Sequence, residues 1–107
     1  MQIREVTPTE LNAELMGEFP PVLLDVREAD ELEISALPNI IHIPMNELPH
    51  RLGELDLNAD TVVICRTGNR SGKVTAFLES QGFRSVRNMA TGMNGWASTV
   101  DPNMPQY

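Results

Sequence analysis

Short apolar runs alternate with segments of helical periodicity along this chain, and this alternation restricts its fold more than any other feature. Residues 22–26, 40–43 and 61–64 are each too short for a helix and are apolar over most of their length, as strands buried on both faces are. Two more strands are expected at residues 3–6 and 84–88. Strands that alternate with helices predict an α/β fold around a mainly parallel sheet of about five strands.

The predicted helices are marked by capping residues and by apolar periodicity. Thr7 suits an N-cap, Pro8 suits the first helical position, and Glu10 stands where a capping box requires a glutamate. This helix is expected to end near Gly17. Further helices are predicted at residues 28–32, 45–52, 71–81 and around 93–97. Pro49 is expected to shorten or kink the second of these.

The composition is that of one globular domain covering residues 1–107. No segment has the apolar run of a signal peptide or the length of a membrane span. The net charge of −7 argues against a nucleic-acid partner, which requires a basic face. One cysteine excludes an internal disulfide and a multi-cysteine metal site, and it suits a reducing compartment. We therefore expect a cytoplasmic protein without metal, cofactor or membrane contact.

That cysteine, Cys65, lies where the strand 61–64 gives way to the helix 71–81. The residues that follow it are rich in arginine, glycine and small polar side chains: Arg66, Thr67, Gly68, Asn69, Arg70 and Ser71. This composition is typical of a loop that folds its backbone N–H groups around an anion. The helix N-terminus and the arginines also favour a thiolate over a thiol. We interpret Cys65 as a nucleophile and the following six residues as its anion-binding loop.

A lone cysteine at a strand end is more often a small core residue, but two arginines this close are hard to bury without anionic partners. The charge along the chain is also uneven. Residues 1–64 contain thirteen acidic and three basic residues, whereas residues 65–107 contain two acidic and five basic residues. Two interpretations stay open: the acidic residues cover exposed helices, or the basic residues create a positive field that attracts anions to Cys65.

Asp25 and Arg27 stand at the carboxyl end of the predicted strand 22–26, the edge at which ligands bind to parallel sheets. Cys65 stands at the same edge, so the three side chains are expected near one site. Asp25 and Arg27 are predicted to pair with each other, with Glu31 or with the loop. A structural ion pair and a supporting role in the site are both consistent with this position.

The loop length separates two kinds of cysteine chemistry. Protein tyrosine phosphatases place five residues between their cysteine and arginine, whereas four residues separate Cys65 from Arg70. The shorter loop suits a single sulfur atom or a small anion better than a phosphate ester. In sulfur chemistry, Cys65 would hold a persulfide stabilised by the loop N–H groups, and an acceptor thiolate or cyanide would remove its terminal sulfur.

Three motifs in order resemble the rhodanese-like sulfurtransferase family over nearly the whole chain. Residues 65–71 are similar to its active loop, residues 24–28 to its Asp-Val-Arg motif, and residues 88–96 to its Gly-Gly-x-x-x-Trp segment. The pair Ile43-Pro44 matches an Ile-Pro ending of the family. Residues 35–40 depart from it, because they lack the usual glycines and histidine.

A second departure is Ala90-Thr91, which replaces the first glycine of the C-terminal motif. The resemblance implies a three-layer rhodanese-like fold and a transferase of the thiosulfate sulfurtransferase type. Cys65 would be catalytic, residues 66–71 would bind the substrate, and Asp25 and Arg27 would support them. Sulfane sulfur would pass from a small anionic donor such as thiosulfate to cyanide or a thiol.

The tail, residues 100–107, is similar to that of rhodanese domains joined to E1-like adenylyltransferases, although an ordinary packed C-terminus explains it as well. This similarity suggests a sulfur-carrier protein, an adenylyltransferase or a cysteine desulfurase as a partner. Two other functions compete with sulfur transfer. A non-catalytic binding module would not need Cys65 and Arg70, and a phosphatase or arsenate reductase of the same superfamily would need a longer loop.

Overall fold

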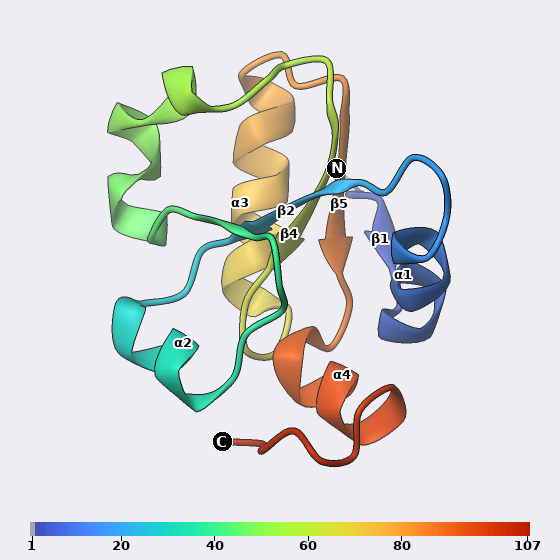
Figure 1. The fold of residues 1–107 in the computed structure, drawn as a ribbon. Helices are drawn as coiled ribbons and strands as arrows, with labels where there is room; N and C mark the ends of the chain where they lie inside the picture. The colour runs from blue at the N-terminus through green and yellow to red at the C-terminus, as the bar shows by residue number, and fades with distance from the viewer. Residues whose placement is uncertain (1) are drawn as a thin grey trace.

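The computed structural model describes residues 2–107 and contains a five-stranded sheet in which all neighbouring strands are parallel (Figure 1). The strand order is β1-β5-β4-β2-β3. The strands are β1 (Glu5–Val6), β2 (Val22–Asp25), β3 (Ile41–His42), β4 (Asp60–Ile64) and β5 (Ser85–Met89). The predicted α/β fold around about five strands is therefore confirmed.

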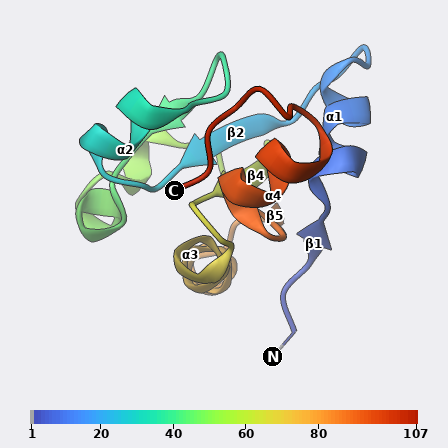
Figure 2. The same cartoon turned by 90° about the horizontal axis from the view of Figure 1, so that it is seen from below.

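Helices cover both faces of this sheet, which gives three layers (Figure 2). One face carries α3 (Asn69–Ser80) and the 3-10 helices η1 (Met45–His50) and η2 (Leu52–Glu54). The other face carries α1 (Pro8–Leu15) and α4 (Gly92–Thr99), while α2 (Ala29–Ile34) follows the end of β2. Among the described residues, no helix combines the length and apolar character needed to cross a bilayer.

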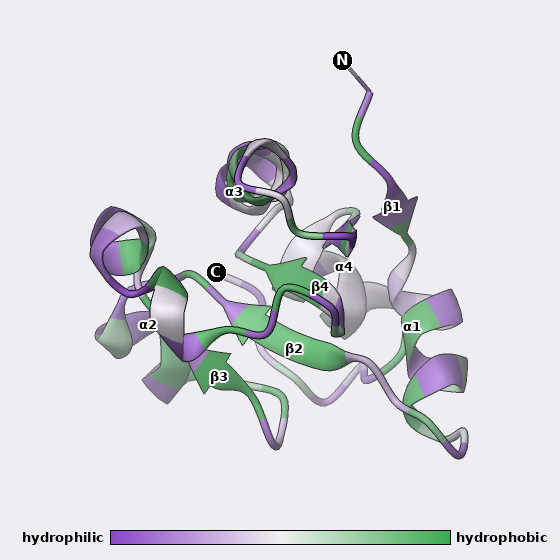
Figure 3. Cartoon of the chain, turned by 90° about the horizontal axis from the view of Figure 1, so that it is seen from above, coloured by the Kyte–Doolittle hydropathy of each residue, from purple (hydrophilic) through white to green (hydrophobic). Residues whose placement is uncertain are grey.

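Alternate residues of the central strands enter the two halves of the core, as the two-residue repeat of a strand requires. Val63 and Cys65 pack on the α3 side, whereas Val62 and Ile64 pack on the α1 and α4 side. The strands β2 and β4 are hydrophobic over most of their length (Figure 3). Since Cys65 follows the last residue of β4, its side chain lies under α3 at the carboxyl edge of the sheet.

The helix starts and ends differ from the predictions in two places that matter for the site. The helix predicted over 45–52, which Pro49 was expected to shorten or kink, is not one α-helix, because residues 45–50 and 52–54 form two short 3-10 helices. Pro49 lacks the N–H that an α-helix needs there, and its ring would meet the carbonyl of the preceding turn. The helix predicted at 71–81 begins at Asn69, so Arg70 belongs to its first turn and not to the loop.

Candidate active site

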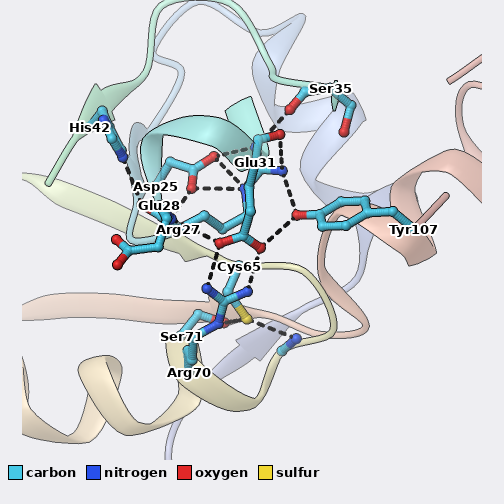
Figure 4. A network of polar contacts seen from close by, with 11 residues as sticks. Asp25, Arg27, Glu28, Glu31, Ser35, His42, Cys65, Arg70, Ser71 and Tyr107 are labelled. Atoms are coloured by element: carbon cyan, nitrogen blue, oxygen red, sulfur yellow. Dashed lines mark hydrogen bonds and ion pairs between the residues drawn. The ribbon is translucent and has the colours of Figure 1, made fainter. Parts of the chain in front are cut away.

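Cys65 directly follows β4, and the residue is 1% exposed. Two hydrogen-bond donors reach its sulfur: the backbone N of Gly68 lies 3.1 Å from Sγ, and the Ser71 Oγ lies 3.2 Å from it (Figure 4). The chain therefore turns around the thiol within four residues. The first turn of α3 then places the helix N-terminus beside the sulfur.

The N-terminus of α4 fixes this loop through backbone hydrogen bonds. The backbone N–H of Met93 donates to the carbonyl of Cys65 at 2.9 Å, and that of Asn94 donates to the carbonyl of Arg66 at 3.0 Å. In a planar trans peptide, the carbonyl and the following N–H point in opposite directions. These two bonds therefore turn the N–H groups of Arg66 and Thr67 away from α4 and toward the thiol side.

Two glycines allow the loop and α4 to approach this closely. Gly68 has a φ of 99° and Gly92 a φ of 58°, both in the left-handed region that favours glycine. A Cβ on Gly92 would lie 2.5 Å from the carbonyl carbon and oxygen of Arg66. Thr91, which replaces the family's first glycine, also has a positive φ, 65°, that a β-branched residue rarely adopts.

Burial raises the pKa of the Cys65 thiol, but hydrogen bonds to the thiolate outweigh this effect. The hydroxyl of Ser71 and the backbone N–H groups of Ser71, Gly68 and Thr67 bring the pKa below its ordinary value. The positive end of the α3 dipole acts in the same direction. The direction agrees with the sequence analysis, but the donors are mainly the backbone and Ser71, and not the two arginines.

Arg70 is paired with Glu31 of α2, so its charge is already engaged by a carboxylate (Figure 4). Its Nη1 lies 2.7 Å from Oε2 and its Nη2 lies 2.8 Å from Oε1, which makes the pair bidentate. Arg70, together with the backbone N–H of Glu28 and the hydroxyl of Tyr107, lowers the pKa of Glu31 to about 2, against the opposing effect of burial. The positive charge of Arg70, one of the two that the sequence assigned to the loop, is therefore neutralised by Glu31.

Asp25 and Arg27 form a buried ion pair with each other, one of the alternatives that the sequence left open. The Nη2 of Arg27 lies 2.8 Å from Oδ2 of Asp25, and both side chains are almost completely buried. Arg27 also donates to the carbonyl of Ser35 at 2.8 Å, and His42 contacts the carbonyl of Arg27 at 2.7 Å. The pair fixes the chain after β2 and does not contact the Cys65 sulfur directly.

Tyr107 connects the tail to this network, a role that the sequence analysis did not predict. Its hydroxyl accepts a hydrogen bond from Arg27 at 2.9 Å and donates one to Glu31 at 2.9 Å. Asn94 of α4 holds the backbone of Tyr107 through two hydrogen bonds. The guanidinium of Arg66 lies over the Tyr107 ring, 4.9 Å from its centroid. Arg66 and Arg70, the two arginines that follow Cys65, therefore both have partners within the chain.

Asn88 is a second functional candidate that the sequence analysis missed. It is the penultimate residue of β5, is 2% exposed, and its Oδ1 accepts a hydrogen bond from Ser71 Oγ. Its Nδ2 donates to the Gly68 carbonyl at 3.1 Å and to Glu5 Oε2 at 2.9 Å. Two signals were available: a polar residue stands near the carboxyl end of a predicted strand, and Asn88 is the first residue of the segment 88–96 that resembles the family's C-terminal motif.

The remaining basic residues of the second half do not gather around Cys65. Arg87 pairs with Glu14 and Asp60, whereas Lys73 and Arg84 are exposed. Thr67 and Asn69 of the loop are also exposed, so the loop contributes mainly its backbone to the sulfur. Of the two interpretations of the charge distribution, the structure favours acidic residues that cover exposed surface and pair with arginines.

A cavity of about 390 Å³ lies where the start of α2, η1 and the first turn of α3 meet. It adjoins the site through Arg70, whose guanidinium pKa is raised mainly by the hydrogen bonds to Glu31 and also by the charge of the nearby Cys65 thiolate. Its lining residues are Val26, Glu28, Met45, Asn46 and Arg70. The volume falls in the range of pockets that hold organic ligands. We call this cavity the mouth of the site. It combines one aliphatic wall with one carboxylate and one paired guanidinium.

The comparison with known protein families decides the identity of the fold. The model of the rhodanese-like domain matches residues 7–99. The chain belongs to the rhodanese-like domain family. A crystal structure of a rhodanese-like domain protein from Staphylococcus aureus superposes with a TM-score of 0.85 at 30% identity, covering 98% of this chain and 99% of that one.

Two curated relatives contain a similar domain, one as nearly its whole length and the other as a small part of a longer protein. The Bacillus subtilis protein YtwF is 34% identical over 102 residues, which cover 95% of this chain and 98% of YtwF. The adenylyltransferase and sulfurtransferase uba4 of Ogataea parapolymorpha is 38% identical over 96 residues, but the match covers only 24% of its length. The similarity to rhodanese domains of adenylyltransferases is therefore confirmed for the domain.

Proposed function

We propose that this rhodanese-like protein is a sulfurtransferase in which Cys65 carries sulfane sulfur as a persulfide. The observation that carries the proposal is the pair of donors on the sulfur, Gly68 N at 3.1 Å and Ser71 Oγ at 3.2 Å. Donors in this position stabilise the thiolate before transfer, and the loop N–H groups stabilise the persulfide anion after it. Burial keeps water away from both species.

The chemistry proceeds in two half-reactions. The Cys65 thiolate attacks the outer sulfur of the donor, so the new S–S bond forms while the donor's own S–S bond breaks. With thiosulfate as donor, the electron pair of that bond leaves with sulfite. Cyanide or an acceptor thiolate then attacks the terminal sulfur, and Sγ leaves as a thiolate. The atoms and electrons balance without a redox cofactor, in agreement with the cofactor-free site that the sequence predicts.

The loop supports this chemistry better than it supports the alternatives. Its donors converge on one sulfur atom, while the guanidinium that a phosphatase would use for phosphate oxygens is bound by Glu31. A binding module would have no need of a stabilised thiolate at Cys65. Since thiolates persist in reducing conditions, we expect the protein to act in the cytoplasm.

Thiosulfate is the test donor, and a protein persulfide is the alternative. The adenylyltransferase and sulfurtransferase uba4 contains a similar domain, which supports an adenylyltransferase or a sulfur-carrier protein as a macromolecular partner. A cysteine desulfurase that delivers a protein persulfide is a third candidate. These partners would be identified by sulfur transfer between purified proteins.

Intact-mass measurement after incubation with thiosulfate or inorganic polysulfide tests the proposal. We expect the wild type to gain one sulfur atom, the Cys65→Ser variant to gain none, and cyanide to reverse the gain. A wild type that gains no sulfur from either donor would contradict the proposal. Hydrolysis of a phosphate ester without sulfur uptake would identify the phosphatase alternative, and absence of both activities would identify a binding module.

A further inference from the structure

We propose that the mouth of the site selects uncharged or cationic aliphatic thiols, and their persulfides, over acidic ones and over dianions such as thiosulfate and sulfite. Glu28 and Glu31 set this preference. The inference rests on the proposed sulfur transfer and specifies its substrate class. It departs from the sequence, whose two loop arginines predict a site for small anions.

The first observation is that neither Arg66 nor Arg70 offers the mouth an unpaired positive charge. Arg70 lines the mouth, but its bidentate contacts to Glu31 leave the pair without net charge. Arg66 does not line the mouth and lies over the ring of Tyr107. A dianion that recruited Arg70 would have to displace Glu31, which burial and Tyr107 hold beside it, and would then face that carboxylate.

Arg70 keeps a role toward an uncharged ligand. A guanidinium carries five N–H donors, and the two contacts to Glu31 leave three of them available. These donors can bind a hydroxyl or a carbonyl oxygen without any net charge. The arrangement therefore favours hydrogen bonding at this wall of the mouth over charge neutralisation.

The second observation is the character of the remaining walls. Glu28 is exposed, lines the mouth, and has no ion-pair partner among residues 2–107. Val26 and Met45, which pack in the same half of the core as Cys65, provide an aliphatic wall beside this carboxylate. Such walls suit a carbon chain attached to the reacting sulfur, with an uncharged or ammonium end group toward Glu28. Lys73 does not line the mouth but a separate cavity, which has Met45 as a shared wall.

The same mouth serves the donor and the acceptor because they differ by one sulfur atom. An acceptor thiolate attacks the terminal sulfur of the Cys65 persulfide, its new S–S bond forms, and Sγ leaves as a thiolate. In the reverse direction, the alkyl persulfide delivers its outer sulfur to the Cys65 thiolate and leaves as the alkyl thiolate. No electrons are gained or lost in either direction. The charge preference of the mouth can therefore be measured with thiols as acceptors, which are more stable reagents than alkyl persulfides.

The test loads the wild-type protein with sulfur from inorganic polysulfide, removes the excess, and follows its discharge by 2-aminoethanethiol, 2-mercaptoethanol, 3-mercaptopropionate and sulfite. Each discharge rate is divided by the concentration of the nucleophile in its anionic form. It is then divided by the rate at which the same nucleophile reacts with a small alkyl persulfide in solution, which corrects for intrinsic reactivity. We expect the normalised rates to fall from the ammonium to the hydroxyl to the carboxylate compound, by roughly three- to fivefold per unit of charge, as for other exposed charge pairs. Sulfite should be the slowest.

The dependence on ionic strength and the variants of Glu28 and Glu31 test whether these carboxylates cause this order of rates. The differences among the four normalised rates should become smaller at high ionic strength, because exposed charges are screened. Glu28→Gln should reduce them, whereas Glu33→Gln, on the same helix but outside the mouth, should leave them unchanged. Glu31→Gln should accelerate sulfite and the carboxylate compound selectively, because it releases Arg70.

Two results would overturn the inference: a carboxylate compound or sulfite that is as fast as the ammonium compound, or equal effects of Glu28→Gln and Glu33→Gln. Both differ from the failure of the proposed function, in which Cys65 takes up no sulfur from polysulfide. The order of rates and its dependence on ionic strength are measured on the wild-type protein. The inference can therefore be tested even if the Glu31→Gln protein does not fold.

Discussion

Ser71 has one hydroxyl proton and two acceptors for it, the sulfur of Cys65 and the amide oxygen of Asn88. While Cys65 is a thiolate, donation to the sulfur stabilises its charge. Once Cys65 forms a persulfide, the charge lies on the outer sulfur and the Ser71 proton can return to Asn88. Ser71 therefore acts on the thiolate state in particular.

This position gives a direct prediction for Ser71→Ala. A hydrogen bond to a charged group contributes about 1.5–3 kcal/mol, and here only the thiolate receives it. The variant should therefore raise the pKa of Cys65. The rate of alkylation by iodoacetamide, measured against pH, reports that pKa. Ser80→Ala, at the far end of the same helix, is the control and should leave the profile unchanged.

Asn88→Asp should also raise the pKa of Cys65. The contacts of Nδ2 with Glu5 and Gly68 orient the amide so that its oxygen faces Ser71. A carboxylate there competes more strongly for the Ser71 proton and adds a negative charge near the thiolate. In the Ser71→Ala background the competition is lost, so the increase should be smaller. Equal increases in both backgrounds would show that Asn88 does not act through Ser71.

At the scale of elements, the contact between the Cys65 loop and α4 requires Gly92. Its positive φ and the position of a Cβ, 2.5 Å from the Arg66 carbonyl, both exclude a side chain. Gly92→Ala should lower the free energy of unfolding by about 2 kcal/mol or more and reduce sulfur transfer. Gly53→Ala is the matched control, because its Cβ would meet no atom within 4 Å. Urea denaturation of both variants checks the difference.

Thr91 gives the opposite prediction at the neighbouring position. A β-branched residue with a φ of 65° is strained, and the family's motif has glycine here. Thr91→Gly removes this strain but adds backbone entropy to the unfolded chain, which offsets part of the gain. We expect a net increase of about 0.5–1 kcal/mol in the free energy of unfolding. A loss of stability would show that the Thr91 side chain stabilises the turn.

The parts of the site that could be predicted from the sequence are local. The strand, loop and helix signals around residues 65–71 were enough to place Cys65, Gly68 and Ser71 together, because these residues are close in the sequence. The Asp25–Arg27 pair spans two residues and was among the expected alternatives. The 3-10 geometry after Met45 was missed because local periodicity does not distinguish a proline-interrupted α-helix from a tighter one.

The parts that could not be predicted depend on the whole molecule. Glu31 and Arg70 are 39 residues apart, and Arg27 and Tyr107 are 80 residues apart. Their contacts follow from strand order and from the path of the tail, which no local pattern specifies. The same contacts change the functional conclusion, since they convert an arginine-rich anion loop into a largely backbone-built sulfur site.

At this scale, the network around Glu31 should make stability depend on acid pH. The pKa of Glu31 is lowered from 4.5 to about 2 in the folded protein, mainly by the side chain of Arg70. A carboxyl group with a lowered folded pKa contributes stability above its unfolded pKa, and this contribution is lost as pH falls through its folded pKa. The relevant window is therefore pH 4.5 to 2, and the contribution is on the order of a few kcal/mol.

Comparison of Glu31→Gln with wild type isolates this contribution from that of the other carboxylates. The two proteins should differ most in free energy of unfolding at pH 5 and above, and should converge as the pH falls toward about 2 and below, because wild-type Glu31 then becomes protonated and resembles glutamine. Glu33→Gln should parallel the wild type throughout. Tyr107→Phe should show part of the Glu31→Gln effect, since it removes one hydrogen bond to the carboxylate and keeps Arg70. A difference between Glu31→Gln and wild type that does not change with pH would mean that the network stabilises the fold by packing and not through the charge of Glu31.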